Sequence, residues 1–205
     1  MKKSVLISIR PKWVERILSG EKTIEVRKTA PKIETPFKCY IYCTQSGKYS
    51  GGKAVKNIWI NRGTKSSFIG NGKIIGEFIC DKIYKIKNLG SKFVVAAATE
   101  SETNKVARES CLSFDDMKEY AGEREYIYGW HISNLTLYNN PKELSEFITH
   151  CKMRNYPFCS ICDYSVRRIS NSKQKGNLLD SEIVGCYMGL KRPPHSWCYG
   201  RTWRE

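Results

Sequence analysis

The pattern of apolar and polar positions predicts a chain built mainly of strands. Four stretches rich in β-branched and aromatic residues favour extended structure. They are residues 4–9, 37–44, 73–86 and 125–138. Gly76 lies inside the third stretch, where an isolated glycine typically marks a β-bulge.

One early helix is predicted between the first two strands. Trp13, Val14, Ile17 and Leu18 form an apolar stripe at helical spacing. Pro11 suits the first turn of this helix, because its missing N–H would be unpaired there in any case.

A short strand with one polar face follows this helix, in the segment "GEKTIEVRK". Ile24 and Val26 alternate with Thr23, Glu25 and Arg27, which is typical of a half-buried strand. Glu25 and Arg27 share a face and can form an ion pair. On a solvated face such a pair would contribute about 0–1 kcal/mol; in a pocket it would position both groups for binding.

The rest of the chain divides into a Gly-, Ser- and Lys-rich loop at 45–72, an unassigned stretch at 88–112, and two short helices. Ser113 and Asp116 form a capping box before a helix over 114–120, and Pro141 opens a helix that runs through Phe147. Five or six strands with few helices predict an α+β protein whose sheet is strongly bent or closed into a small barrel. We divide the chain into a domain at 1–138 and an extension at 139–205 whose final strand, 195–200, returns to the barrel.

Charge favours a polyanionic partner. The formal net charge is +15. Residues 1–90 carry 19 Lys and Arg against 6 Asp and Glu, whereas residues 91–150 carry 6 against 10. Such an asymmetric field is typical of proteins that bind nucleic acid. Tyr126, Tyr128 and Trp130 alternate on one strand face, where they either stack bases or fill the core.

No apolar run reaches the roughly 20 residues that a membrane span needs. The first apolar stretch is also shorter than the core of a signal peptide. We therefore expect a cytoplasmic protein with no membrane partner; the sequence leaves its oligomeric state open.

The segment "GEKTIEVR" fits the pattern G-x-K-x-x-E-x-R and, with the preceding strand and helix, resembles the ASCH domain family of the PUA-like superfamily. The similarity continues through "FKCYIYCT" and "GKIIGEFICDKI" and extends to "YGWHISNL" and "RPPHSWCY". The resemblance implies a PUA-like small β-barrel with the early helix packed on it, binding RNA or a modified nucleotide in a cleft beside that helix.

Carried over by position, the resemblance implies Lys22, Glu25 and Arg27 as pocket residues. Some ASCH-like proteins are amidohydrolases that remove the acetyl group of N4-acetylcytidine, using a lysine at the position of Lys22 and a threonine at the position of Glu25, helped by a later glutamate. Here Glu25 replaces that threonine, and Glu77 is the candidate for the later glutamate. Arg10 and Lys12 add positive charge at the start of the helix, a favourable place for a phosphate.

Cysteines cluster near the C-terminus. Cys151, Cys159 and Cys162 include a C-x2-C step, half of a typical structural zinc site. Cys186 is our first choice as fourth ligand, with Cys198, His150 and His195 as alternatives. An iron–sulfur cluster or free thiols are the other interpretations. Cys39, Cys43, Cys80 and Cys111 are predicted to be small apolar residues in or near the core.

The leading hypothesis is therefore an RNA- or modified-nucleotide-binding protein. One alternative is a hydrolase of a modified base or RNA, either amidohydrolase-like or ribonuclease-like, that uses Lys22 with Glu25 or Glu77. A second alternative is a protein-interaction module acting through the loop at 45–72.

Overall fold

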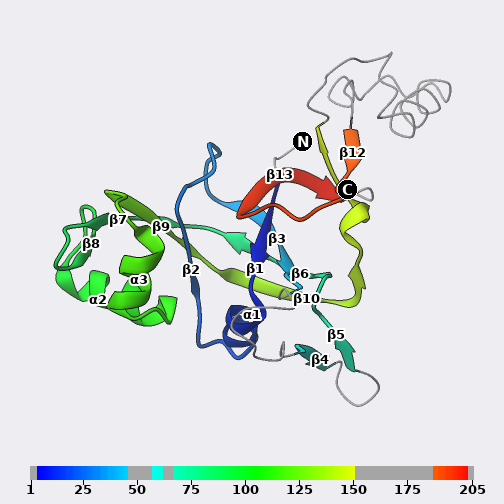
Figure 1. Ribbon diagram of the computed structural model, residues 1–205, viewed down its shortest axis with the longest axis horizontal. Helices are drawn as coiled ribbons and strands as arrows, with labels where there is room; N and C mark the ends of the chain where they lie inside the picture. The colour runs from blue at the N-terminus through cyan, green and yellow to red at the C-terminus, as the bar shows by residue number, and fades with distance from the viewer. Residues whose placement is uncertain (1–3, 46–56, 62–66, 151–186, 203–205) are drawn as a thin grey trace.

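β1 (Ser4–Ile9) is buried along its whole length and lies inside the larger of two main sheets (Figure 1). The computed structural model describes residues 4–45, 57–61, 67–150 and 187–202. In this part of the chain the larger sheet has the order β10 (Ser133–Lys142), β6 (Ile74–Cys80), β3 (Phe37–Cys43), β1, β13 (Trp197–Thr202), β11 (Phe147–His150) and β12 (Tyr187–Gly189). β1 pairs in parallel with β3 and antiparallel with β13, so strands from the two ends of the chain lie side by side.

The smaller sheet carries the motif strand. Its order is β2 (Ile24–Arg27), β9 (Tyr126–His131), β7 (Ile83–Asn88) and β8 (Phe93–Val95). Two helices, α2 (Glu100–Ser110) and α3 (Phe114–Ala121), cover one face of it (Figure 1). Val106 of α2 and Ala121 of α3 pack there against Ile24, Val26 and Ile127.

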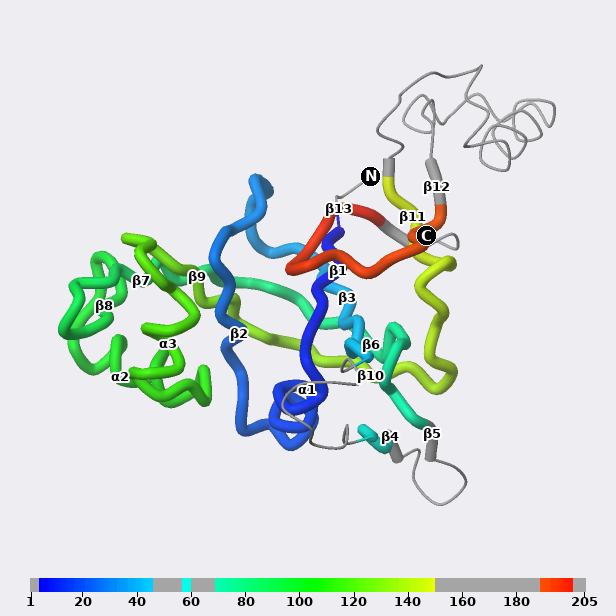
Figure 2. Tube along the Cα trace, viewed as in Figure 1, coloured from blue at the N-terminus to red at the C-terminus, as the bar shows by residue number. Residues whose placement is uncertain are grey.

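In the described residues the chain crosses between the two main sheets four times, from β1 to β2, from β2 to β3, from β6 to β7 and from β9 to β10. The last two crossings take place within nearly continuous extended segments. β6 leads into β7 through Asp81 and Lys82, and β9 leads into β10 through Ile132 (Figure 2). At this corner the His131 amide donates to the Lys82 carbonyl over 2.9 Å. The stretches 73–86 and 125–138, each predicted as one strand, are therefore each divided between the two sheets.

The described strands do not close into the small barrel that the sequence predicted; the observed architecture is mixed α+β with two main sheets. Closure requires hydrogen bonds between the outermost strands. β13 instead occupies the second edge of β1, and β11 and β12 continue outward from it. The C-terminal strands therefore extend the sheet where a barrel would have closed.

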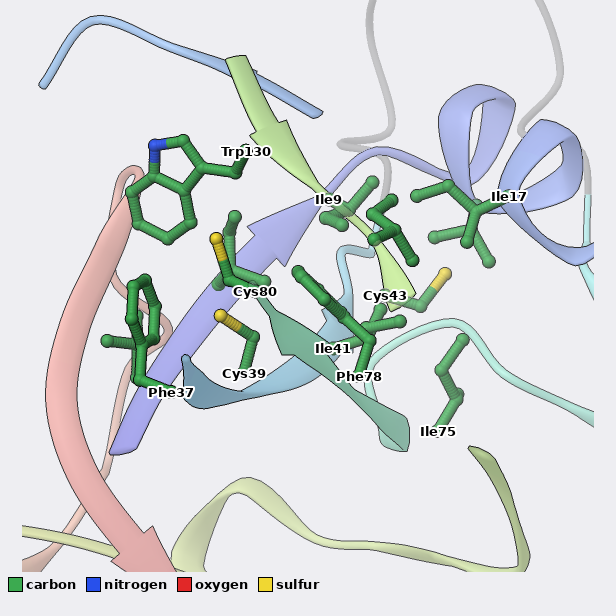
Figure 3. Close-up of a cluster of buried hydrophobic side chains, with 14 of the residues drawn as sticks. Ile9, Ile17, Phe37, Cys39, Ile41, Cys43, Ile75, Phe78, Cys80 and Trp130 are labelled. Carbon is green, nitrogen blue, oxygen red and sulfur yellow. The ribbon is translucent and has the colours of Figure 1, made fainter. Parts of the chain in front are cut away.

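The main core lies between the larger sheet and α1 (Pro11–Leu18). Val14 and Ile17 of the predicted stripe are buried there, and Trp13 and Leu18 pack against the same cluster. Figure 3 shows the thiols of Cys39 and Cys80 within this cluster, close to Phe37 and Trp130. Cys39, Cys43 and Cys80 are fully buried, which confirms their predicted place as small apolar residues in the core; Cys111 is half-buried.

Of the two helices that follow β8, the sequence predicted α3 but not α2. α3 begins with the expected capping box of Ser113 and Asp116. α2 falls in the unassigned stretch, although Thr99 caps it and accepts a hydrogen bond from the Glu102 amide. The spacing Thr99-x-x-Glu102 is itself a capping-box signature, so this signal was present and was missed.

The loop predicted at 45–72 contains paired strands in its described part. β4 (Trp59–Asn61) and β5 (Ser67–Ile69) form a two-stranded ribbon, and Ile58 is buried in the main core. The helix predicted from Pro141 is limited to a 3-10 turn, Leu144–Glu146, because β10 continues to Lys142. Within the described ranges, no helix has the length and apolar character to cross a membrane.

Gly76 lies where two strands approach too closely for a side chain. The pairing of β3 with β6 changes register there, between Ile41 and Tyr42, as expected for a bulge. A Cβ on Gly76 would lie 2.4 Å from the backbone carbonyl oxygen of Thr136. We expect Gly76→Ala to lower the free energy of unfolding by about 1–3 kcal/mol, because the backbone must move. Urea denaturation measures this, and Thr136→Ala, on the exposed side of the same contact, is the control. Equal stabilities of the two variants would contradict the close approach.

The α3 capping box predicts a pH dependence of stability. The hydrogen bond from Ser113 lowers the pKa of Asp116 below its usual 3.8. The native state therefore binds the proton less tightly than the unfolded state, so this contribution is full above about pH 4 and disappears as the pH falls through the native pKa. We expect Ser113→Ala to cost about 1 kcal/mol at pH 7.

Asp116→Asn should be less stable than the wild type at pH 7, with the difference shrinking toward pH 3. Thermal unfolding across this pH range measures it. Asp115→Asn removes one charge from the same turn and is the control; a matching pH trend in that variant would contradict the assignment.

Candidate nucleotide-binding site

β2 presents its polar residues toward the protein interior. Glu25 and Arg27 lie on the face opposite Ile24 and Val26, as the alternation predicts, yet all four residues are buried. The second face is covered by the larger sheet, since Arg27 contacts Ser8 of β1 and Ser196, the residue just before β13. The polar face of the motif is therefore an interior surface rather than a solvated one.

Lys22, Glu25 and Arg27 form a buried ion cluster, with 2%, 6% and 6% of their surface exposed. One Glu25 oxygen, Oε1, lies 2.9 Å from Arg27 Nη2, and the other, Oε2, lies 3.4 Å from Lys22 Nζ. One carboxylate thus serves two cations, and the cluster carries one net positive charge.

Backbone carbonyls also accept hydrogen bonds from both cations. Lys22 Nζ donates to the carbonyl of Ser110 over 2.5 Å, and Arg27 Nη2 donates to the carbonyl of Ser8 over 2.6 Å. Ser110 is the last residue of α2. The ammonium group therefore lies at the negative end of that helix, where the macrodipole stabilises a cation. The cluster links β2 to β1, α2 and the segment before β13.

Aromatic rings flank the cluster. Lys22 Nζ lies 5.1 Å from the Trp13 ring centroid, and the ammonium of Lys12 lies 4.4 Å from the same centroid. Tyr120 of α3 lies near the other side, with the ammonium of Lys28 5.1 Å from its ring. Burial raises the pKa of the Tyr120 phenol, and the nearby Arg27 guanidinium partly opposes this.

Two buried donors next to the cluster have no hydrogen-bond partner among the described residues: Arg27 Nε and the indole Nε1 of Trp130. Trp130 is the register partner of Glu25 on β9, and Arg27 lies two residues further along β2 on the same face. Buried donors are almost always satisfied in folded proteins. Each of these donors would therefore be stabilised by an acceptor oxygen.

Arg10 and Lys12 are both exposed and lie at the start of α1. Arg10 is the N-cap residue but makes no side-chain capping hydrogen bond. Its positive charge slightly opposes the rise in the pKa of the Tyr120 phenol that burial causes. The predicted binding residues are thus a buried triad, Lys22, Glu25 and Arg27, and two exposed cations, Arg10 and Lys12.

Glu77 lies away from this group. Its carboxylate accepts a hydrogen bond from Tyr138 and pairs with Lys38 Nζ at 3.1 Å. Tyr138 packs against the core cluster that contains Tyr40, whereas Trp13 packs against the cluster on the other face of the larger sheet. The structure therefore places Glu77 and Lys22 on opposite faces of that sheet.

The predicted zinc ligands Cys151, Cys159, Cys162 and Cys186 lie outside the described residues. Within the described part, no group of three or more His, Cys, Asp or Glu side chains is arranged to hold a metal. Burial raises the pKa of Cys43 and Cys80 to about 12 and that of Cys198 to about 11. These thiols are protonated at neutral pH, so they are poor nucleophiles.

Sequence reasoning missed the groups that hold the triad in place. Ser8 and Ser110 contribute through backbone carbonyls, which carry no residue-type signal. Ser196 accepts from Arg27 through both its carbonyl and its hydroxyl oxygen, but it is far from Arg27 in the sequence. Tyr120 lies on a helix that the capping box predicted, but nothing in its spacing indicated contact with β2. These neighbours are identified only by the tertiary structure.

The shared carboxylate predicts an order of stabilities among charge variants. Glu25→Gln leaves two buried cations without a counter-charge, so we expect a loss of about 3–5 kcal/mol in the free energy of unfolding. Lys22→Met keeps the apolar stem and leaves a balanced Glu25–Arg27 pair. Its cost should be about 1–3 kcal/mol, from the Ser110 carbonyl that loses its donor. Urea denaturation of both variants measures the order, and a larger loss for Lys22→Met would contradict the shared role of Glu25.

Comparison with known proteins identifies the family. The family model described as "ASCH domain" matches residues 7–142. No curated protein matches. Among solved structures, an ASCH protein from Zymomonas mobilis is similar at 18% identity and a TM-score of 0.44, with 69% of this chain and 74% of that chain covered. A mutant of the same protein is similar at 14% identity and a TM-score of 0.49, with 97% and 88% covered. The motif Lys22-x-x-Glu25-x-Arg27 lies inside the matched range, and this chain belongs to the ASCH domain family, whose fold is PUA-like.

Proposed function

We propose that this ASCH protein binds RNA or a modified nucleotide at the buried ion cluster and the exposed cations beside it. The observation that carries the proposal is the pair of buried donors, Arg27 Nε and Trp130 Nε1, which lack partners among the described residues and lie next to a cluster with one net positive charge. Phosphate and base carbonyl oxygens are strong acceptors for such donors.

The cost of the cluster supports a functional role. Burying three charged side chains is expensive, and well-packed apolar residues of similar size often give equal or greater stability. A buried ion cluster that apolar residues could replace without loss of stability is a candidate functional site. Its positive excess selects an anionic ligand, and Arg10 and Lys12 add exposed positive charge where the ligand approaches.

The alternative hydrolase hypothesis has less support in the geometry. Glu77 lies on the opposite face of the larger sheet from Lys22, and both oxygens of Glu25 already pair with cations. Glu25 therefore acts in our proposal as the group that orients Lys22 and Arg27. The interaction module proposed for 45–72 depends largely on residues outside the described part.

Binding of a labelled single-stranded RNA at several salt concentrations tests the proposal. We expect wild-type affinity to fall steeply with salt, because cations bind phosphates and displace their counterions. Arg10→Ala combined with Lys12→Ala should weaken binding at each salt concentration. It should also flatten the slope of log K against log salt by about 1.4, because each phosphate neutralised on a single strand accounts for about 0.7 of that slope.

Lys105→Ala combined with Arg108→Ala is the matched control, since it removes two charges from α2. Equal losses of affinity in the two double variants would show a diffuse charge effect and contradict the site. Mass spectrometry of modified and acylated nucleosides after incubation with the protein completes the test. A product formed by the wild type but not by Lys22→Met would replace the binding proposal with the hydrolase.

A further inference from the structure

The smaller sheet has one face covered by helices and another face that is only partly covered. On β9, Ile127 packs beneath α2 and α3. The alternate residues Tyr126, Tyr128 and Trp130 therefore point to the second face, together with Lys85 and Lys87 of β7, which are the register partners of the two tyrosines. The larger sheet covers one end of this second face.

The larger sheet covers the second face at Trp130 but not at Tyr126, so burial decreases along β9. Trp130 is fully buried, with its ring centroid 5.8 Å from that of Trp197. Tyr128 is half-buried and packs against the edge of the main core. Tyr126 is half-buried as well, but it belongs to neither of the two core clusters that flank this sheet. The phenol rings of Tyr126 and Tyr128 are therefore partly accessible to solvent.

Cations surround these rings. Lys85 is exposed, and its ammonium lies 3.9 Å from the ring centroid of Tyr126. The ammonium of Lys87 lies 6.0 Å from the same ring and 3.6 Å from the Glu125 carboxylate. Arg124 and Lys28 are also exposed and line the same hollow. The Lys28 ammonium lies against Tyr120 of α3, so three cations, Lys85, Lys87 and Arg124, accompany the one carboxylate of Glu125, and the surface attracts anions.

The two tyrosines border an open hollow of about 490 Å³, lined by Lys28, Thr29, Ala30, Arg124, Glu125, Tyr126 and Tyr128, with Lys85 and Lys87 beside it on β7. Its wall after β2 is held in place: the Trp197 indole donates to Thr29 Oγ1 over 3.1 Å, and the Lys32 amide donates to the Tyr199 hydroxyl over 2.6 Å. Sites for small ligands typically measure about 300–1,000 Å³.

We infer that this surface is a second contact site for single-stranded RNA, in which a base stacks on Tyr126 and its flanking phosphates pair with Lys85 and Arg124. The inference rests on the proposed function and adds to it a site outside the Lys22–Glu25–Arg27 cluster. Every base has a face that stacks on an aromatic ring, so this contact is tolerant of sequence. Lys85 is exposed and flexible, so its ammonium can leave the ring face for a phosphate when the base arrives.

An acidic peptide is the competing partner for a positively charged surface. It would use the cations and gain little from accessible phenol rings inside a concave site. The interleaving of Tyr126 and Tyr128 with Lys85 and Lys87 on adjacent strands matches a chain that alternates bases with phosphates. Single-stranded nucleic acid therefore fits the observed chemistry better.

Fluorescence anisotropy with a labelled uridine 12-mer tests the inference on the full chain. Tyr126→Leu keeps an apolar side chain but removes the ring, and should weaken binding about 5- to 100-fold. Tyr126→Phe keeps the ring and should bind within about 2-fold of the wild type. Lys85→Ala alters an exposed residue. It should flatten the salt slope by about 0.7, the value for one phosphate contact.

Phe114→Leu is the matched control. Phe114 is an exposed aromatic residue, 41% accessible, with the ammonium of Lys118 5.9 Å from its ring, but it lies on α3 outside the cavity. The affinity of this variant for the 12-mer should equal that of the wild type. A glutamate-rich peptide, used as competitor, distinguishes the two classes of partner.

The outcomes separate this inference from the proposed function. Loss of binding in Tyr126→Leu and Lys85→Ala, with Tyr126→Phe and Phe114→Leu unchanged, supports the second site. Wild-type affinity in Tyr126→Leu and Lys85→Ala, with weakened binding in the Arg10 and Lys12 double variant, overturns the second site alone. Absence of wild-type binding overturns both proposals. The glutamate-rich peptide could instead displace the 12-mer from the wild type and bind Lys85→Ala more weakly. That result assigns the surface to a protein partner and overturns the inference.

Discussion

The structure depends most on the Glu25 carboxylate, which pairs with Lys22 and Arg27 inside the protein. The three side chains come from one short segment of the chain, yet their other partners belong to β1, α2 and the segment before β13. The cluster therefore ties the smaller sheet to the larger one across an interior that is otherwise apolar. Its stability requires each charge to be matched, because an unpaired charge at this depth costs several kcal/mol.

The same arrangement links the fold to the proposed function. The cluster holds two cations at fixed positions, and Arg27 Nε and Trp130 Nε1 are donors without a partner among the described residues. Donors held in place would bind an anion without a large entropy cost on binding. Exposed cations at the start of α1 lie on one side, and β9 presents Tyr126 and Tyr128 on the second face of the smaller sheet. The β2 strand and the residues directly after it contribute to both surfaces, so one short segment organises the two proposed contacts.

Interactions between residues close in the sequence allowed some of the helices to be predicted. Proline at Pro11, the apolar stripe of Val14 and Ile17, and the Ser113–Asp116 capping box each act within one or two helical turns, and the structure confirms the helices that they predict. The Thr99–Glu102 signal has the same range and was missed. The barrel prediction was wrong, because the described strands divide between two main sheets that do not close, and no local pattern encodes which strands become the outermost ones.

The sequence by itself determined the family and where most of the strand-forming segments lie along the chain. It also determined the alternation that places Glu25 and Arg27 on one face of β2, since side-chain direction along a strand has a period of two. Only the tertiary structure decided that this face is interior, that Glu77 lies on the opposite face of the larger sheet from Lys22, and that Tyr126 stays accessible while Trp130 is buried. Burial depends on which distant segments pack against a face, and that is a property of the assembled sheets rather than of any one strand.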